Sequence, residues 1–196
     1  MRLLPPFLGL FAAAAVLAFA RASSSGVEAG TALRMDVPEL ARRSDLIVEG
    51  RVLSQKPLET SQGLIETEFL IEVERTLAGE HVPLRAIRLP GGLLPDGRGL
   101  LLAGMPSLRV GERVMLFLTP RSPGGVRMPV GLAQGKLSIV ADAAGEKLLV
   151  GDPGALGLVS PGSEVGGAES LSVLPYAEVV AQIEAARSGA AAGEKR

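Results

Sequence analysis

The sequence contains no cysteine and a single histidine, which excludes several common kinds of site from the start. Zinc sites are built mainly from cysteine and histidine, and this chain lacks enough of either. Without cysteine there is no disulfide, so packing alone must stabilise the fold. A serine nucleophile needs a neighbouring histidine or lysine as its base. His81, between Glu80 and Val82, is expected in an exposed turn, so the sequence predicts no catalytic, cofactor-binding or metal-binding residue.

Aromatic residues are also scarce, with five phenylalanines, one tyrosine and no tryptophan in 196 residues. The core must therefore be built from leucine, valine, isoleucine and alanine. Charges nearly balance, at 20 Lys+Arg against 21 Asp+Glu. Nucleic-acid binding needs a basic stripe, and attachment to anionic lipid needs a polybasic segment. We therefore expect no nucleic-acid partner, and no stable membrane insertion because only the first twenty residues hold a long apolar run.

The N-terminal segment is typical of an export signal. Arg2 provides a positive start, Phe7 to Ala20 is apolar, and Ala18 and Ala20 place small residues where a signal peptidase reads. The run is shorter than the roughly 20 residues of a transmembrane helix. We predict a signal peptide over residues 1–20, and therefore an exported protein, periplasmic or extracellular. An uncleaved membrane anchor is the alternative.

The rest of the chain is expected to form one domain, because a chain of about 150 residues can bury some 70% of its unfolded surface. We predict a flexible lead-in over residues 21–35, a single β-rich domain over 36–187 and a disordered tail over 188–196. A short helix is expected at Val37 to Arg43, with Asp36 as its cap. A closing helix is expected after Pro175, where apolar residues follow at helical spacing.

Between these helices the pattern predicts six to seven short, mostly antiparallel strands. The clearest is Ile65 to Glu74, where apolar residues alternate with glutamates at period two. Closure removes exposed sheet edges, so we prefer a small OB-like antiparallel barrel over a sandwich. Two Gly/Pro-rich loops are expected, at Pro90 to Gly99 and Gly151 to Gly167. The remaining predicted strands are 45–53, 85–89, 113–119, 126–132, 136–140 and 147–150.

An acidic row on the Ile65 to Glu74 strand is the one candidate for carboxylate chemistry. Its members are Glu66, Glu68, Glu72 and Glu74. Such a row could bind calcium, with Asp96 or Asp152 as guesses for further ligands, or serve as an acid/base pair in a hydrolase. The favoured interpretation is a solvated outer face whose charges oppose aggregation of the sheet.

Several segments resemble a known domain. They are Ser44–Val52, Thr67–Gly79, Leu89–Gly92, Val110–Leu118 and Gly131–Gly135. Together they look like an uncharacterised β-rich domain family of exported bacterial proteins, sometimes encoded near matrixin-like metalloproteases. The resemblance spans about Asp36 to Ile183.

The "Ser-Asp-Leu-Ile-Val-x-Gly-x-Val" stretch is also similar to the netrin-like, OB-barrel module of metalloprotease inhibitors. Those inhibitors grip zinc through an N-terminal cysteine, which this chain lacks. This second resemblance therefore implies only a barrel shape.

The sequence favours an exported, non-enzymatic binding module, with a protein of the cell envelope or medium as partner. The two long Gly/Pro-rich loops could carry recognition, since loops on a rigid scaffold often do. A carboxylate-dependent hydrolase and a structural component of the cell envelope are the alternatives.

Overall fold

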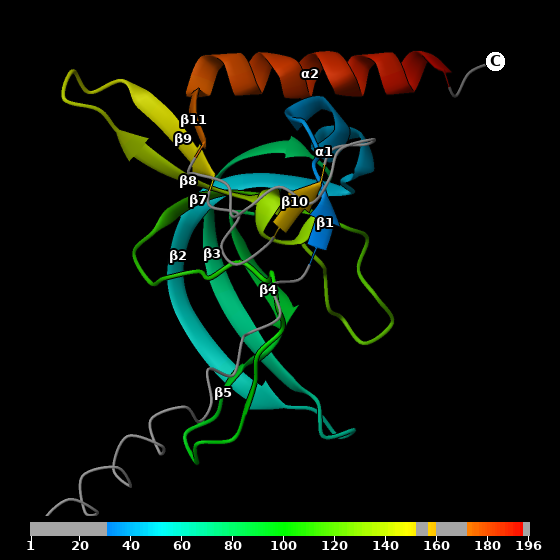
Figure 1. The fold of residues 1–196 in the computed structure, drawn as a ribbon, viewed down its shortest axis with the longest axis vertical. Helices are drawn as coiled ribbons and strands as arrows, with labels where there is room; N and C mark the ends of the chain where they lie inside the picture. The colour runs from blue at the N-terminus through cyan, green and yellow to red at the C-terminus, as the bar shows by residue number, and fades with distance from the viewer. Residues whose placement is uncertain (1–30, 152–156, 160–171, 194–196) are drawn as a thin grey trace, which may run out of the picture.

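A computed structural model describes residues 31–151, 157–159 and 172–193. The predicted signal peptide, most of the loop expected at Gly151 to Gly167, and Asp152 lie outside these residues. Eleven strands, two α-helices and one short 3-10 helix occur in the described part (Figure 1). In chain order they are β1 (Thr31–Leu33), α1 (Val37–Arg43), β2 (Leu46–Glu59), β3 (Ile65–Ala78), β4 (Leu84–Pro90), β5 (Gly92–Leu93), β6 (Gly99–Leu100), β7 (Arg113–Leu118), η1 (Leu132–Gly135), β8 (Lys136–Ala141), β9 (Lys147–Gly151), β10 (Gly157–Val159), β11 (Ser172–Pro175) and α2 (Tyr176–Gly193).

Seven of the strands form one antiparallel sheet, which confirms the mainly β prediction. Their order across the sheet is β11-β9-β8-β7-β2-β3-β4. The preferred barrel does not form, because the ladder does not close on itself. A single bridge joins Arg88 of β4 to Val126, with the Arg127 amide donating to the Arg88 carbonyl at 3.0 Å. Among the described residues, the far edge of β4 is thus touched by a loop and not paired with a strand.

The strand predicted at 126–132 is wrong, and its residues explain why. Pro129 has no amide to give to a ladder. Gly131 and Leu132 both take positive φ values, 66° and 59°, which turn the chain into η1. The segment therefore makes an isolated bridge from Pro129 to Leu118 and then leaves the sheet.

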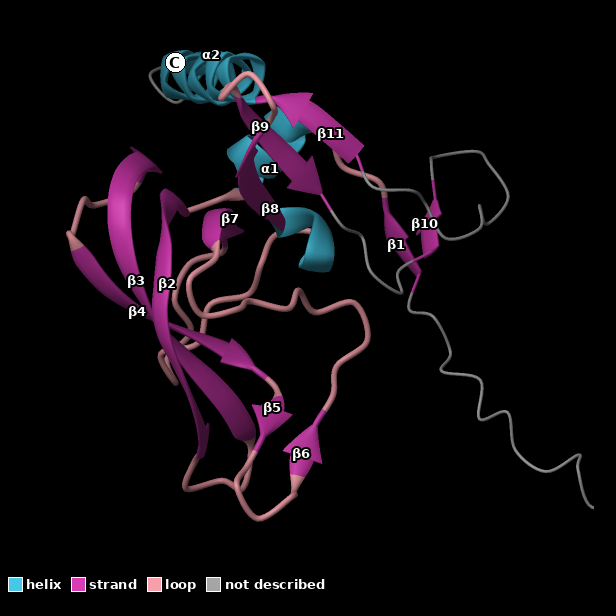
Figure 2. Ribbon diagram, turned by 90° about the vertical axis from the view of Figure 1, so that its left-hand side faces the viewer, coloured by secondary structure: helices cyan, strands magenta, loops and turns pink. Residues whose placement is uncertain are grey.

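The long β2–β3 hairpin curls, and three shifts in the register between β2 and β3 accompany the bend. They fall between Ile47 and Val48, Glu49 and Gly50, and Val52 and Ser54. A β-bulge bends its strand and increases the local twist. At Gly50 the strands approach so closely that an added Cβ would lie 2.3 Å from the carbonyl oxygen of Glu72. Figure 2 shows the resulting arc of β2, β3 and β4, with β5 and β6 opposite its hairpin end.

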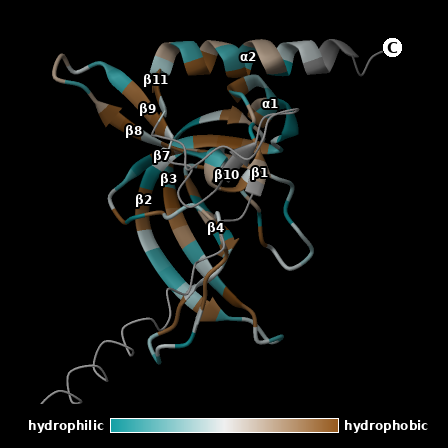
Figure 3. Cartoon of the chain, in the orientation of Figure 1, coloured by the Kyte–Doolittle hydropathy of each residue, from teal (hydrophilic) through white to brown (hydrophobic). Residues whose placement is uncertain are grey.

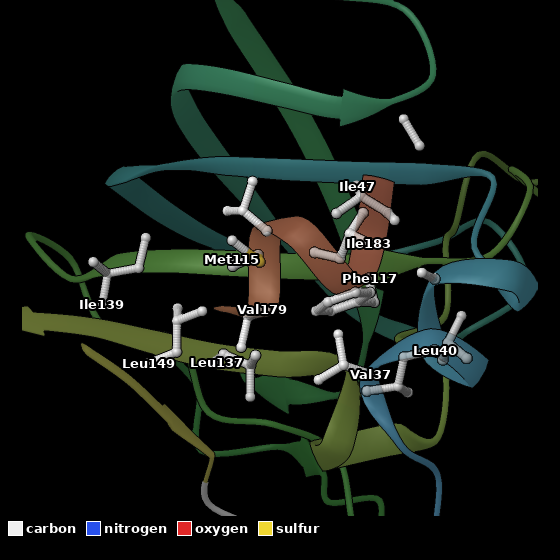
Figure 4. Packing of buried hydrophobic residues seen from close by; sticks show 14 residues of the cluster. Val37, Leu40, Ile47, Met115, Phe117, Leu137, Ile139, Leu149, Val179 and Ile183 are labelled. Atoms are coloured by element: carbon white, nitrogen blue, oxygen red, sulfur yellow. The ribbon is translucent and has the colours of Figure 1, made fainter. Parts of the chain in front are cut away.

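Two hydrophobic clusters lie on opposite faces of the sheet. The first joins the sheet to both helices, and Figure 4 shows Val37 and Leu40 of α1 and Val179 and Ile183 of α2 around Phe117. The second lies inside the curl and comprises Leu46, Val48, Val52, Phe69, Ile71, Val73, Ile87, Leu89, Leu108, Val114, Leu116 and Leu118. Strand β7 supplies both clusters, as expected for an apolar run buried on both sides.

The helix predicted at Val37 to Arg43 is confirmed, including its cap. The Glu39 amide donates to Asp36 Oδ1 at 2.7 Å. Helix α2 instead continues to Gly193, where the sequence predicts a disordered tail from residue 188. The alanines at 190–192 favour a helix strongly enough to extend it. In the described ranges, neither helix is long and apolar enough to cross a membrane.

Part of the predicted flexible lead-in is ordered. β1 pairs in parallel with β10. The Gln134 side chain binds the same segment, accepting from the Met35 amide at 2.8 Å and donating to the Leu33 carbonyl at 3.0 Å. A side-chain amide can satisfy a backbone donor and acceptor at once, which explains how residues 33–35 are held.

Candidate functional site

A pocket of about 350 Å³ opens at the hairpin end of the curled sheet. Its floor includes Phe69 and Leu89, which belong to the cluster inside the curl. Figure 2 shows β5 and β6 facing β2 and β3 at this end. The described residues that line the pocket are Gln55, Pro57, Thr67, Phe69, Leu89, Pro90, Gly91, Gly92, Leu93, Leu100, Leu101, Leu102, Met105, Pro106, Ser107 and Leu108. The pocket is thus an open extension of the hydrophobic core, and its volume falls in the range of small binding sites.

Three exposed leucines stand at the rim of this pocket. The exposed fraction is 66% for Leu93, 93% for Leu101 and 39% for Leu102. Single exposed leucines are common on protein surfaces, but apolar residues grouped around a pocket mark contact sites. We call Leu93, Leu101 and Leu102 the leucine rim.

The backbone around Gly91 and Gly92 fixes one side of the pocket. The Gly91 amide donates to the Ile65 carbonyl at 2.8 Å, and the Thr67 hydroxyl donates to the Gly91 carbonyl at 2.7 Å. Gly92 has a φ of 142°, and an added Cβ would lie 2.3 Å from the Thr67 hydroxyl oxygen. Only glycine fits this position, so the loop is held tightly against β3.

An ion-pair clamp, formed by Arg98, Glu59 and Asp96, holds the β5–β6 hairpin against the end of β2. The Arg98 guanidinium donates to both carboxylate oxygens of Glu59, at 2.9 and 2.7 Å, and to Asp96 at 2.9 Å. The hydrogen bonds from Arg98 hold the pKa of Glu59 and of Asp96 below their ordinary values. The three charged groups of the clamp therefore bind one another.

The four glutamates predicted to form an acidic row do not gather into a site. Glu68 pairs with Arg88 at 3.1 Å, and Glu74 pairs with Arg113. Glu72 is exposed, whereas Glu66 is buried with its Oε2 atom lacking a hydrogen-bond partner among the described residues. The interpretation of the row as a solvated outer face is therefore correct for Glu72 and wrong for Glu66. Glu68 and Glu74 each pair with an arginine. Figure 3 shows hydrophobic and hydrophilic residues alternating along β3, the strand on which the row was predicted.

The opposite face of β3 is as the sequence predicts. Five alternating side chains from Ile65 to Val73 are all buried: Ile65, Thr67, Phe69, Ile71 and Val73. In the described ranges, no cluster of three or more histidine, aspartate or glutamate side chains could hold a metal ion. Asp96 is engaged by Arg98 and lies outside any such cluster. His81 is exposed, with its Nδ1 3.0 Å from the Thr76 hydroxyl.

A second polar cluster surrounds Glu49, which is only 2% exposed. The Tyr176 hydroxyl donates to this carboxylate, and Arg113 and Lys147 lie 3.4 and 3.3 Å from it. The Lys147 ammonium also sits 4.8 Å from the centre of the Tyr176 ring. Burial and the bond to Glu49 raise the pKa of Tyr176. Each of these groups already has a partner within the protein. The cluster therefore joins α2 to the sheet and does not form an open site.

A third cluster lies at the start of β8. The Lys136 ammonium and the Ser138 hydroxyl both donate to Glu112 Oε1, at 2.5 and 2.7 Å. Burial raises the pKa of Glu112, but these hydrogen bonds outweigh it and hold the pKa below its ordinary value. The Lys136 ammonium and the Ser138 hydroxyl thus both bind the same carboxylate oxygen.

The sequence singled out only four of the sixteen lining residues as part of a recognition loop. The Pro90 to Gly99 loop was predicted as one that could carry recognition, and it supplies Pro90 to Leu93. Leu100 to Leu102 and Met105 to Leu108 were not singled out. The sequence did contain one signal for this part of the pocket, the three consecutive leucines at 100–102. Apolar residues next to a Gly/Pro-rich loop suggest a contact surface, because such loops lie at the protein surface.

Comparison with protein-family models and with curated proteins finds no match to this chain. The site must therefore be interpreted from its own residues.

Proposed function

We propose that this chain is an exported, non-enzymatic binding module that engages another protein through the pocket and its leucine rim. The observation that carries the proposal is the grouping of Leu93, Leu101 and Leu102 around an open pocket with no charged residue in its lining. Protein contact sites typically combine an apolar centre with exposed aliphatic side chains, because burial of that surface drives association.

The hydrolase alternative receives less support from the same residues. An acid/base pair needs two carboxyl groups about 5 to 9.5 Å apart that both face a substrate cleft. Glu68 and Glu74 are each bound by an arginine, and none of the four glutamates lines the pocket. No feature of the described residues favours a purely structural role in the cell envelope.

The resemblance of the sequence to a domain family of exported bacterial proteins also supports the proposed function. The curled hairpin is compatible in shape with the OB-like barrel of netrin-like modules, although the sheet is open at β4. Export itself rests on the sequence of residues 1–20. Mass spectrometry of the protein recovered from the periplasm or medium should find a chain that begins after Ala20 or Ala22.

A capture experiment tests the binding function. The chain is produced in its native cells, cross-linked and purified, beside a Leu101→Asp/Leu102→Asp double variant. Leu84→Asp is the matched control, because Leu84 is 52% exposed and does not line the pocket. We expect one partner to be recovered with the wild-type chain and the control but lost from the double variant. A partner retained by all three chains, or recovered with none, would contradict the proposal.

A further inference from the structure

We infer that the pocket receives an uncharged segment of a partner polypeptide that carries two neighbouring aliphatic side chains. The inference rests on the proposed function and adds the chemistry of the partner. It follows from the charge, the size and the polar groups of the site.

The lining excludes a charged ligand group. None of the sixteen lining residues is charged, although 21% of the chain is. A charge brought into the pocket would lose its hydration without gaining a partner, which is strongly unfavourable. Arg98 and Asp96, in the turn of the β5–β6 hairpin, are bound to each other and, through Arg98, to Glu59 in the clamp. An incoming charge that took either of them as a partner would have to compete with the clamp.

The volume sets the amount of apolar material that fits. A cavity of roughly 150 Å³ accepts one benzene-sized group. At about 350 Å³, this pocket has room for about two aliphatic side chains. The leucine rim extends the apolar surface beyond the cavity, since Leu101 is 93% exposed. A small molecule held inside the cavity would leave that surface in water, whereas a polypeptide crossing the rim would cover it.

The few polar groups of the lining suit peptide groups. Gln55 and Ser107 bring a side-chain amide and a hydroxyl to the pocket, and both residues are exposed. A buried peptide N–H or C=O needs a hydrogen-bond partner, and these two side chains can each donate and accept. Thr67 is less available because it already donates to the Gly91 carbonyl. Two aliphatic side chains would thus contact the apolar lining residues, and the neutral backbone beside them would bind Gln55 and Ser107.

The test uses a fluorescently labelled, capped glycine–serine peptide that contains two leucines separated by one residue. Two matched peptides carry aspartate or lysine between the leucines. Fluorescence anisotropy with the purified chain should show saturable binding of the neutral peptide. Both charged peptides should bind at least about tenfold more weakly, which corresponds to 1.4 kcal/mol. Leu101→Asp should weaken the neutral peptide to a similar degree, whereas Leu84→Asp should leave its affinity unchanged.

Several outcomes would overturn this inference. Equal binding of charged and neutral peptides would show that the pocket does not select an uncharged segment. Saturable binding of octanol without binding of any peptide would assign the pocket to small molecules. Dimerisation of the chain that Leu101→Asp abolishes, measured by sedimentation, would assign it to a second copy. If no peptide binds but the capture experiment still yields a partner that needs Leu101 and Leu102, the inference fails while the proposed function stands.

Discussion

The Arg98 guanidinium faces the Glu59 carboxylate with two parallel hydrogen bonds, of 2.9 and 2.7 Å. The pair joins the turn between β5 and β6 to the last residue of β2. This two-pronged geometry is specific to arginine and fixes orientation as well as distance. Because the β5–β6 hairpin forms one wall of the pocket, the pair determines how firmly that wall is held.

Replacing Arg98 should therefore loosen the hairpin without unfolding the domain. In Arg98→Ala we expect faster amide hydrogen exchange over residues 91–102, measured by mass spectrometry, and an almost unchanged thermal midpoint, since exposed ion pairs contribute little to global stability. Arg98→Lys is the matched control for charge, and it should recover only part of the protection because lysine lacks the planar fork. Unchanged exchange in Arg98→Ala would show that packing alone holds the hairpin.

The clamp should also weaken in acid. The side-chain hydrogen bond from Arg98 lowers the pKa of Glu59, and backbone and side-chain bonds from Arg98 lower that of Asp96. A carboxyl group with a lowered pKa in the folded state stabilises that state above its ordinary pKa, and the contribution is lost as pH falls through the lowered value. Carboxyl-carbon NMR titration of Glu59 should therefore give a midpoint below about 4.3. In Arg98→Ala the midpoint should return toward that value, and a midpoint that does not move would contradict the assignment of the cause to Arg98.

The sheet was largely predictable because its strands carry local signals. The alternation from Ile65 to Val73 and the apolar run of β7 each report which side chains are buried, and both predictions hold. The Asp36 cap is equally local. Closure of the sheet was not predictable in this way, because it depends on Gly131 and Leu132 taking positive φ values after a plausible strand pattern.

Most of the pocket could not be predicted, because it joins segments that are distant in the sequence. Gln55 and Pro57 of β2 meet Leu100 to Leu102 through the curl of the sheet and the clamp between Arg98 and Glu59. No periodic pattern encodes that contact. Glu66 shows the opposite error, since a regular alternation placed it in solvent whereas at the start of β3 it is buried.

Tyr176 offers a direct probe of the buried cluster around Glu49. It is the only tyrosine and the chain has no tryptophan, so near-ultraviolet absorbance of phenolate reports this side chain alone. Burial, followed by the hydrogen bond to Glu49, raises its pKa. An acid whose pKa is raised by folding stabilises the folded state below the ordinary value of about 10, and that contribution is lost as pH rises through the raised value. We expect a spectroscopic midpoint above about 10, and a smaller elevation in Glu49→Gln. A midpoint at the ordinary value in the wild-type chain would contradict the buried hydrogen bond.

Removal of the same hydroxyl should reduce stability. Tyr176→Phe keeps the ring beneath Lys147 but takes away the donor to the Glu49 carboxylate. Hydrogen bonds to charged groups contribute about 1.5–3 kcal/mol, so urea unfolding should show a loss in this range. Gln182→Ala is a suitable control, because the Gln182 amide donates to Glu178 in an exposed contact of the same helix. A loss in the control as large as that in Tyr176→Phe would place the stabilisation in the surface pair.

Two glycine-to-alanine substitutions should change stability in opposite directions. At Gly50, beside a shift in the register of β2 and β3, an added Cβ would lie 2.3 Å from the Glu72 carbonyl oxygen and 2.8 Å from Ile71 Cγ2. Because the backbone atom cannot move aside cheaply, we expect Gly50→Ala to cost about 1–3 kcal/mol or more. Gly189 lies within α2 with nothing within 4 Å of the added Cβ, so Gly189→Ala should stabilise by at most about 0.5–1 kcal/mol. Thermal and urea unfolding of both variants measure the difference. Tolerance of alanine at Gly50 would mean that β2 and β3 can separate there, and the curl that shapes the pocket would then have another cause.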